Sequence, residues 1–581
     1  MRALKWLLVQ CEKPWAARVI ILIALGLALP SIFSPYFIDE YIQEGKWKAW
    51  HDDLPRPGKQ HILNDYFSFT DESRNAMEME RLGVWWMAPD LKMSFWRPLS
   101  AATHLIDHTL WPRNTTAIHL HGLFWFLALL VAIHFLFRRF LPPGIANLAL
   151  ALYAWDDARG MVLSWIANRH ALIAGFLGTC VLITHDKWRR DQWRPGAWLA
   201  PALFALGLLS SEMAVSTAAF LFGYALWVDQ GPLSRRMARL LPFFLVAVAW
   251  QAVYLAGGYG AQATAGYVSP LVEPFTYVVK LLERSPIYLL GQLTPLDSMF
   301  YGLSPPGMKV VIILFALAVL AIASRVMWPR LAGDPQSRFW LVGAVLSLPI
   351  ICTSATWDRN LVFVGLGMAP ALAMVIASFV GNPPSTRWPR IVVVALALFN
   401  LGLAPMMLPL KSLTMLGLSR IFPSPDDSIP RDPAIVQKTL VLPSVMFEAP
   451  LWFTWVKRDG EGIPRPGKAR ILAASFGDVT ITRLDDFTLR LRPADGFFSS
   501  DSSKLFRGDS RPYHQGDVTT LSNMTARITE LTKDGRPQIV EFRFATRLES
   551  PEWLWMRSVP TGLASWSPPK VGETVVLPAV R

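Results

Sequence analysis

Two adjacent acids, Asp39 and Glu40, follow the first strongly apolar segment, in the stretch Phe37-Ile38-Asp39-Glu40-Tyr41. A carboxylate in such a place can serve as a general base that takes a proton from a hydroxyl group. A neighbouring like charge can orient it or raise its pKa. Acids are also ordinary at solvated helix ends, and position alone favours that structural interpretation.

Three arginines are candidates to bind a phosphate group: Arg97, Arg169 and Arg359. The planar guanidinium group matches pairs of phosphate oxygens. Arg97 is equally well explained as an interfacial side chain with its head in water. Arg169 and Arg359 can instead pair with an acid such as Asp358 or Glu212, and Glu212 is better explained as a structural partner of an arginine than as a catalyst.

The histidines, aspartates and cysteines give no clear metal-ligand set. His119 and His121 are two residues apart and point to different faces of a helix, so at least one is expected to pack through hydrogen bonds. Asp156-Asp157 can bind a metal or form a turn. Cys11, Cys180 and Cys352 show no ligand spacing and no obvious disulfide pair. We expect no cofactor, with a divalent metal left open only by the two aspartates.

The elements that position these residues are apolar helices. Of the 581 residues, 52% are hydrophobic and 17% are charged, against about 25% charged in soluble domains. The apolar residues form runs of the length that crosses a bilayer as a helix. We predict a polytopic α-helical membrane protein with about eleven spans, at about residues 17–34, 116–137, 141–155, 162–184, 195–210, 214–228, 240–255, 310–324, 339–352, 361–380 and 391–410.

Positive charge indicates the topology. The net charge of +13 comes from Lys and Arg clustered between apolar runs, which favours membrane orientation over nucleic-acid binding. The first apolar segment is expected to be a retained helix with a cytoplasmic N-terminus, because Pro35-Tyr36-Phe37 is not a small-residue cleavage site. The basic segments then lie inside, and Asp39, Asp156, Arg169, Glu212 and Arg359 lie on or near the outer face. The basic segments are 138–140, 185–194, 229–239, 325–338 and 381–390.

Two long outer segments and a C-terminal domain complete the expected organisation. Residues 35–115 form a first large loop with one or two short surface helices, and 257–306 an interfacial or broken helix. Residues 1–415 make up the transmembrane domain. Residues 421–581 read as a separate extramembrane all-β domain, with hairpins over 479–492 and 524–544.

Several short motifs resemble the C-type glycosyltransferases (GT-C), in particular the transmembrane-and-tetratricopeptide group of protein O-mannosyltransferases and their bacterial relatives. The matching segments lie in the family's order over about residues 15–410, although the tetratricopeptide repeats are absent. They are Asp39-Glu40, Trp96-Arg97-Pro98-Leu99 with Asp107 and His119-Leu120, Ser164-Trp165-Ile166-Ala167-Asn168-Arg169, Ser211-Glu212-Met213-Ala214-Val215, and Asp358-Arg359-Asn360-Leu361. The family's His-Pro is replaced by Asp156-Asp157, and the Lys before its second acid by Ser211.

The resemblance implies a membrane glycosyltransferase with a polyprenyl-phosphate-linked sugar as donor. Asp39 would be the general base, with Glu40 beside it, and transfer to an acceptor hydroxyl would invert the anomeric carbon. Arg97, Arg169 and Arg359 would hold the donor phosphate, supported by His119, Glu212 and Asp358.

The partners and the setting are expectations of the same kind. The partners expected are the lipid donor, membrane lipid and a protein or glycan acceptor, without nucleic acid. We expect a bacterial inner membrane with the β domain in the periplasm. Two alternatives remain: a non-catalytic lipid-glycan transporter or assembly scaffold, and a ligase that uses lipid-diphosphate donors.

Overall fold

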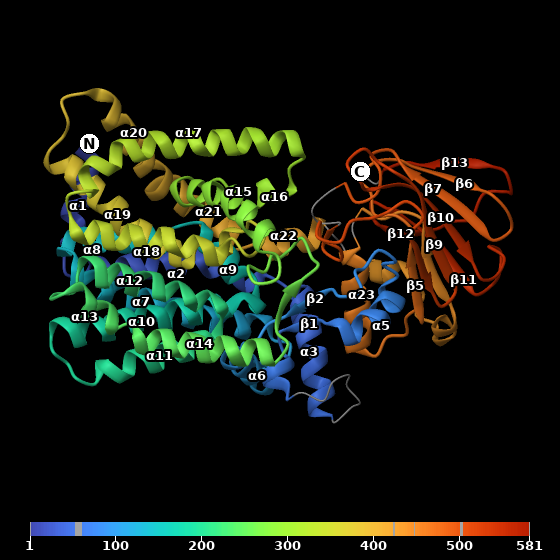
Figure 1. The fold of residues 1–581 in the computed structure, drawn as a ribbon, viewed down its shortest axis with the longest axis horizontal. Helices are drawn as coiled ribbons and strands as arrows, with labels where there is room; N and C mark the ends of the chain where they lie inside the picture. The colour runs from blue at the N-terminus through green and yellow to red at the C-terminus, as the bar shows by residue number, and fades with distance from the viewer. Residues whose placement is uncertain (1, 53–60, 422–424, 447, 500–503, 580–581) are drawn as a thin grey trace. The chain divides into compact units, whose positions relative to one another are not determined.

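The polypeptide passes repeatedly between two units of structure (Figure 1). The computed structural model describes residues 2–52, 61–421, 425–446, 448–499 and 504–579. Unit 1 comprises Met1–Tyr36, Trp96–Tyr259 and Pro274–Gly417, and unit 2 comprises Phe37–Phe95, Gly260–Glu273 and Leu418–Arg581.

Unit 1 is helical because its sequence consists of long apolar runs with few turn residues. Its helices are α1 (Arg2–Cys11), α2 (Ala16–Ala28), η1 (Leu29–Phe33), α6 (Pro98–Leu110), α7 (Thr115–Phe140), α8 (Pro143–Ala154), α9 (Ala158–Ser164), η2 (Ile166–Asn168), α10 (Arg169–Arg190), α11 (Gly196–Ser210), η3 (Glu212–Val215), α12 (Ser216–Trp227), α13 (Leu233–Ala238), α14 (Leu241–Ala256), α15 (Pro274–Leu293), α16 (Met299–Leu303), α17 (Pro306–Leu331), α18 (Pro335–Ile351), η4 (Asp358–Asn360), α19 (Val362–Gly381), α20 (Arg387–Leu398), η5 (Phe399–Leu403) and α21 (Ala404–Lys411).

Each predicted span overlaps one or more helices. Seven helical segments of the described chain are long and apolar enough to cross a membrane: Ala16–Phe33, Thr115–Phe140, Ile166–Arg190, Leu233–Ala256, Gly307–Leu331, Val362–Gly381 and Arg387–Lys411. The other four expected spans fall on the shorter helices α8, α11, α12 and α18. The chain is therefore an integral membrane protein with a largely helical membrane unit.

The central and peripheral helices differ in what surrounds them. Most of α10 and α19 is buried by other helices, whereas most of α14 and α17 is exposed. Large apolar side chains such as Phe244 on α14 and Leu314 on α17 are 63% and 62% exposed. In a membrane protein such faces contact lipid, since lipid chains are as apolar as the side chains.

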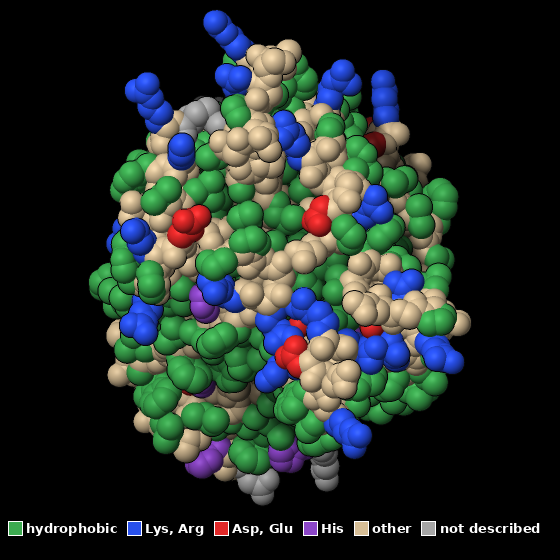
Figure 2. Space-filling model, turned by 90° about the vertical axis from the view of Figure 1, so that its left-hand side faces the viewer, with side chains coloured by type: hydrophobic (Ala, Val, Ile, Leu, Met, Phe, Trp, Pro, Cys, Tyr) green, Lys and Arg blue, Asp and Glu red, His purple; other side chains and the backbone are tan. Residues whose placement is uncertain are grey.

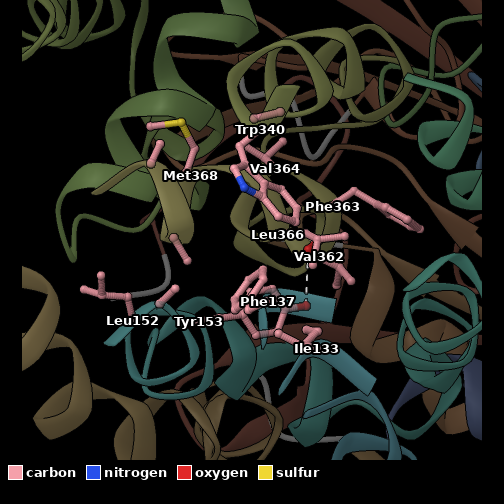
Figure 3. Close-up of a cluster of buried hydrophobic side chains, with 14 of the residues drawn as sticks. Ile133, Phe137, Leu152, Tyr153, Trp340, Val362, Phe363, Val364, Leu366 and Met368 are labelled. Atoms are coloured by element: carbon pink, nitrogen blue, oxygen red, sulfur yellow. Dashed lines mark hydrogen bonds between the residues drawn. The ribbon is translucent and has the colours of Figure 1, made fainter. Parts of the chain in front are cut away.

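The core of unit 1 lies where α7, α8, α18 and α19 pack together (Figure 3). The Tyr153 hydroxyl donates to the carbonyl of Val362 at 3.2 Å, so this buried polar group is satisfied. A Cβ at Gly367 would lie 2.3 Å from the Trp340 carbonyl oxygen. Glycine at this position therefore permits the close approach of α18 and α19.

Basic residues gather at one end of unit 1. Figure 2 views the end at which α1 and α13 lie, and Lys and Arg side chains are spread across it with few acids visible. Two acids partly neutralise the arginines: Asp186 pairs with Arg190 at 2.5 Å, and Asp229 pairs with Arg239 at 2.9 Å. This charge pattern is that of a cytoplasmic end, although the orientation itself stays a prediction.

Two expectations about unit 1 helices require correction. The predicted helix 162–184 is split, because the backbone of Trp165 is extended (φ −106°, ψ 105°) and a new helix, α10, begins at Arg169. For residues 257–306 we expected an interfacial or broken helix; they contain the short helix α16 and the continuous helix α15, whose interfacial position stays a prediction. The charges of α15 are accommodated locally, because Lys280 pairs with Glu283 at 2.9 Å and Arg284 donates to two backbone carbonyls.

Unit 2 combines sheets with short helices. The helices are α3 (Ile38–His51), α4 (Ile62–Asp65), α5 (Glu72–Leu82), η6 (Pro425–Ser428), η7 (Pro433–Gln437) and α23 (Ala449–Glu461). The strands are β1 (Ser68–Thr70), β2 (Lys92–Ser94), β3 (Gly260–Gln262), β4 (Thr439–Leu442), β5 (Lys468–Ile471), β6 (Val479–Arg483), β7 (Thr488–Pro493), β8 (Val518–Leu521), β9 (Met524–Leu531), β10 (Pro537–Phe544), β11 (Trp553–Val559), β12 (Gly562–Ser565) and β13 (Thr574–Leu577). Helix α22 (Thr414–Ile421) spans the boundary between the units in sequence.

Both predicted hairpins are present. Strands β6 and β7 pair antiparallel, as do β9 and β10. They belong to a six-stranded sheet of order β13-β6-β7-β10-β9-β8, and β12-β11-β4-β5 forms a second sheet. The alternation of buried and exposed residues on β7 and β9 explains the pairing, since one face of each strand is covered.

The composition and boundaries of this unit differ from the sequence prediction. It is not purely β, because β4 pairs in parallel with β5 and β11 and the helix α23 follows β4. The first large loop, which we assigned to the transmembrane domain, groups largely with the C-terminal region. The reason is hydrophobic: Val84, Trp85 and Trp86 are buried in one cluster with residues of the β-sheets.

Candidate functional site

Asp107 is the centre of a buried polar network in unit 1. Its Oδ2 pairs with Arg169 Nη1 at 2.5 Å, and its Oδ1 lies 2.6 Å from His121 Nδ1. The Trp125 indole donates to His121 Nε2 at 3.1 Å, so a neutral His121 with its proton on Nδ1 fits both partners. The network joins α6, α7 and α10 and fixes the position of the Arg169 guanidinium.

A second ion pair lies at the start of α6. Arg97 Nε donates to Glu212 Oε2 at 2.8 Å, and the Tyr254 hydroxyl donates to Glu212 Oε1 at 3.3 Å. Glu212 follows Ser211, whose hydroxyl lies 3.0 Å from His170 Nδ1. The structure thus pairs Glu212 with an arginine, as predicted, but the partner is Arg97 rather than Arg169 or Arg359.

Arg359 differs from the other two arginines. Its guanidinium carbon lies 4.5 Å from the centre of the Trp165 ring and 5.5 Å from that of Trp357. In the described part of the chain no carboxylate lies within ion-pair distance of it, and its buried Nε has no hydrogen-bond partner. Stacking between aromatic rings holds the group while leaving its donors for a ligand.

Two histidines lie between these groups. Burial, and then the nearby charge of Arg169, hold the pKa of His104 well below its usual value, so His104 is neutral at pH 7. His170 is within electrostatic range of Arg97, Arg359 and His104. The three predicted phosphate-binding arginines therefore share one region of unit 1. Asp107 and Glu212 neutralise two of the three arginines, so one positive charge is left for an anion.

A separate cluster surrounds Lys411 at the end of α21. Its Nζ lies 2.6 Å from Asp157, 2.6 Å from Asp358 and 3.3 Å from Asp297. Burial raises the pKa of Asp157 to about 7, and burial together with Asp358 raises that of Asp297. Asp358, predicted to support the phosphate site, instead links Lys411 to the Ser298 hydroxyl at 2.6 Å.

Asp156 and Asp157, the two aspartates that left a metal open, have polar partners within the chain. Asp156 accepts from Gln292 Nε2 at 2.7 Å and pairs with Arg159 at 3.2 Å, and Asp157 pairs with Lys411. Among the residues that the structure describes, no group of three or more His, Cys, Asp or Glu side chains is arranged to hold a metal ion. Both carboxylates serve as partners of buried cations.

His119 occupies a structural position. Its Nδ1 lies 3.1 Å from the Leu163 carbonyl and its Nε2 lies 3.1 Å from that of Ser34. The side chain is 3% exposed and joins the start of α7 to the end of α9 and to the residue that follows η1. We expected at least one of His119 and His121 to pack through hydrogen bonds, and both of them do.

Asp39 and Glu40 lie in the first turn of α3, in unit 2. Glu40 is 4% exposed and accepts from the backbone N–H of Phe37 at 3.0 Å, so it caps its own helix. Asp39 is half-buried, six residues along the chain from the end of η1. The approach of Asp39 to the arginines of unit 1 stays a prediction.

Sequence reasoning missed several polar residues that the structure buries in unit 1. Asp107 was noticed only as part of a motif, and His104, His170 and Lys411 were not singled out. A signal was available for Lys411, because a lysine at the end of an apolar helix, opposite three aspartates on one predicted face, requires partners.

The fold and the site together define an integral membrane protein with a cationic cluster in its helical unit and a β-rich unit beside it in sequence.

No protein-family model matches the chain, and no curated protein matches its sequence. Some solved structures are similar in fold at low identity. ArnT from Cupriavidus metallidurans bound to undecaprenyl phosphate has a TM-score of 0.40 and 10% identity, covering 77% of this chain and 88% of that one.

Oligosaccharyltransferase from Archaeoglobus fulgidus gives similar values. Its apo form has a TM-score of 0.42 and 10% identity, with 80% of this chain and 65% of that one covered. The form tethered to an acceptor peptide has a TM-score of 0.40 and 11% identity, with 80% and 64% covered. TM-scores near 0.4 do not assign an activity, a substrate or residue roles to this chain.

Proposed function

We propose that this protein is a membrane glycosyltransferase that moves a sugar from a polyprenyl-phosphate-linked donor to an acceptor hydroxyl at the outer face. The observation that carries the proposal is the arginine set of unit 1. Arg359, stacked on Trp165 and Trp357 without a carboxylate partner among the described residues, has donors to offer an anion. A lipid-linked phosphate is an anion that a membrane protein meets at the bilayer surface.

The choice of donor rests on the charge balance and on the motifs. The three arginines exceed their two acids by one positive charge, which suits the singly charged phosphodiester of such a donor better than a neutral ligand. The motif order resembles that of GT-C enzymes with monophosphate donors.

The proposed chemistry uses this chain's residues as follows. The carboxylate of Asp39 takes the proton of the acceptor hydroxyl, and the acceptor oxygen forms a bond to the anomeric carbon from the face opposite the phosphate. The bond from that carbon to the phosphate oxygen breaks, and the phosphate leaves with the electron pair. Arg359, with Arg97 and Arg169, stabilises the charge that develops on the leaving oxygen.

The test combines transfer with lipid identification. Membranes with Asp39→Asn should lose transfer from polyprenyl-monophosphate hexoses to endogenous acceptors, whereas Glu72→Gln, an exposed acid of unit 2, should retain it. Mass spectrometry of lipid extracted from the purified wild type should find polyprenyl monophosphate. Wild-type turnover by Asp39→Asn would contradict the proposed role of Asp39, absence of transfer by the wild type would favour transport or scaffolding, and a co-purified lipid diphosphate would favour a ligase.

A further inference from the structure

Unit 2 contains a cavity of about 580 Å³, and none of the residues assigned to the proposed transfer chemistry lines it. Its walls come from α3, α5 and α23, with contributions from β1 and Phe506. This volume lies within the range of small-molecule binding pockets, which are about 300–1,000 Å³. All the lining residues belong to unit 2, so the cavity is a property of that unit alone.

The charges of the lining are balanced and largely paired. Four cations and four carboxylates line the cavity. Arg74 pairs with Asp65 at 2.9 Å, and Arg81 pairs with Asp459 at 2.5 Å. Lys46 lies 3.3 Å from Asp65 and donates to its carbonyl oxygen at 2.6 Å. An anionic ligand would find few cations without a carboxylate, so the lining favours an uncharged one.

The polar wall offers both donors and acceptors. Glu78 and Arg81 lie one helical turn apart on α5 and pair at 3.3 Å. In the described structure Glu78 Oε2 and Arg81 Nε each lack a hydrogen-bond partner. One accepts and the other donates, and a ligand hydroxyl does both. A ligand with only an anionic group or only a cationic group would bond to just one of these two atoms.

The remaining wall is apolar and helical. Trp452 lies on it, with its ring centre 5.9 Å from that of Phe506. Aromatic and aliphatic surface suits a ligand with a carbon face as well as hydroxyls.

From this combination we propose that the cavity between α3, α5 and α23 binds a neutral saccharide. Its hydroxyl groups bond to the paired charges of α5, and its carbon face packs on the wall that includes Trp452. Saccharide binding does not depend on the transfer activity. That the bound saccharide is the acceptor glycan rests on the proposed function.

Gly45 provides a direct way to fill the cavity. It lies in α3 and lines the cavity, and a Cβ built on it meets no atom within 4 Å. Replacing a helical glycine with another residue usually increases helix stability. Gly45→Phe should therefore occupy the space without unfolding α3, and Gly45→Ala is the matched control that changes the backbone but hardly the volume.

The experiment is saturation-transfer NMR on the full chain in a phosphocholine detergent, since maltoside detergents are themselves saccharides. The probes are neutral trisaccharides of glucose, mannose, galactose and N-acetylglucosamine, with inorganic phosphate as the anionic probe. We expect at least one trisaccharide to bind to wild type and Gly45→Ala, with at least tenfold weaker binding to Gly45→Phe. No trisaccharide signal, equal signal in Gly45→Phe, or a Gly45→Phe-sensitive signal for phosphate alone would overturn the proposal.

The two proposals fail separately. Loss of saccharide binding with Asp39-dependent transfer intact would remove the cavity assignment alone. Normal saccharide binding by a wild type that transfers no sugar from polyprenyl-monophosphate donors would remove the transferase alone.

Discussion

Arg169 and Asp107 form an ion pair of 2.5 Å, and each side chain is only 2% exposed. They come from α10 and α6, and His121 of α7 contacts the same carboxylate at 2.6 Å. The pair therefore positions a cation of the candidate phosphate site and also joins three helices. A buried pair of this kind contributes little net stability, but removing one partner leaves an uncompensated charge.

Asp107→Asn should destabilise unit 1 by about 3–5 kcal/mol, because Arg169 stays charged and buried without its carboxylate. Chemical denaturation of the purified protein in detergent measures the change. Asp191→Asn is the control, since Asp191 pairs with Arg139 at 2.9 Å but is 46% exposed, and should cost less than about 1 kcal/mol. Equal effects of the two substitutions would contradict the burial argument.

Hydropathy predicted the spans well because each helix must be apolar over a fixed length to cross the membrane. It could not show that a helix breaks at Trp165, because the break depends on distant partners: the hydroxyl of Ser164 bonds to the Met415 amide at 2.9 Å and to the Ser34 hydroxyl at 3.0 Å. The motifs likewise selected the arginines. Which acid meets which arginine depends on three-dimensional packing, so Glu212 was assigned to an arginine but not to Arg97.

Lys411→Met should destabilise the protein in a pH-dependent way. Among the described residues Lys411 is the cation within ion-pair distance of Asp157, Asp297 and Asp358. Without it, the three buried carboxylates repel one another and take up protons more readily. The loss should be about 3–5 kcal/mol at pH 8 and smaller at pH 5, where protonation removes the charges. Denaturation at the two pH values measures it, and a loss independent of pH would contradict this account.

Glu448 gives unit 2 a pH-dependent stability of predictable sign. Glu448 is 5% exposed, and burial raises its pKa to about 7. The folded state therefore holds a proton that the unfolded state, with a pKa near 4.3, releases. Stability should fall as pH rises from about 4.3 to about 7, by at most about 1.4 kcal/mol per pH unit. Glu448→Gln should flatten this slope in thermal melts between pH 5 and 8, and an unchanged slope would assign the titration to another group.

Substitutions of Arg359 should reduce sugar transfer much more than they reduce the stability of the protein. Arg359 stacks on Trp165 and Trp357, and among the described residues no carboxylate would lose its ion pair if Arg359 were replaced. Arg359→Ala should therefore lower the free energy of unfolding by at most about 2 kcal/mol. It should nevertheless reduce transfer about 10²–10³-fold by removing a donor to the leaving phosphate. Arg359→Lys keeps the charge but loses the planar fork of donors, so its transfer rate should lie between those of the wild type and Arg359→Ala. Arg97→Leu is the contrast, since it leaves Glu212 without its ion pair and should lower both stability and transfer. Normal turnover by Arg359→Ala would contradict the phosphate role.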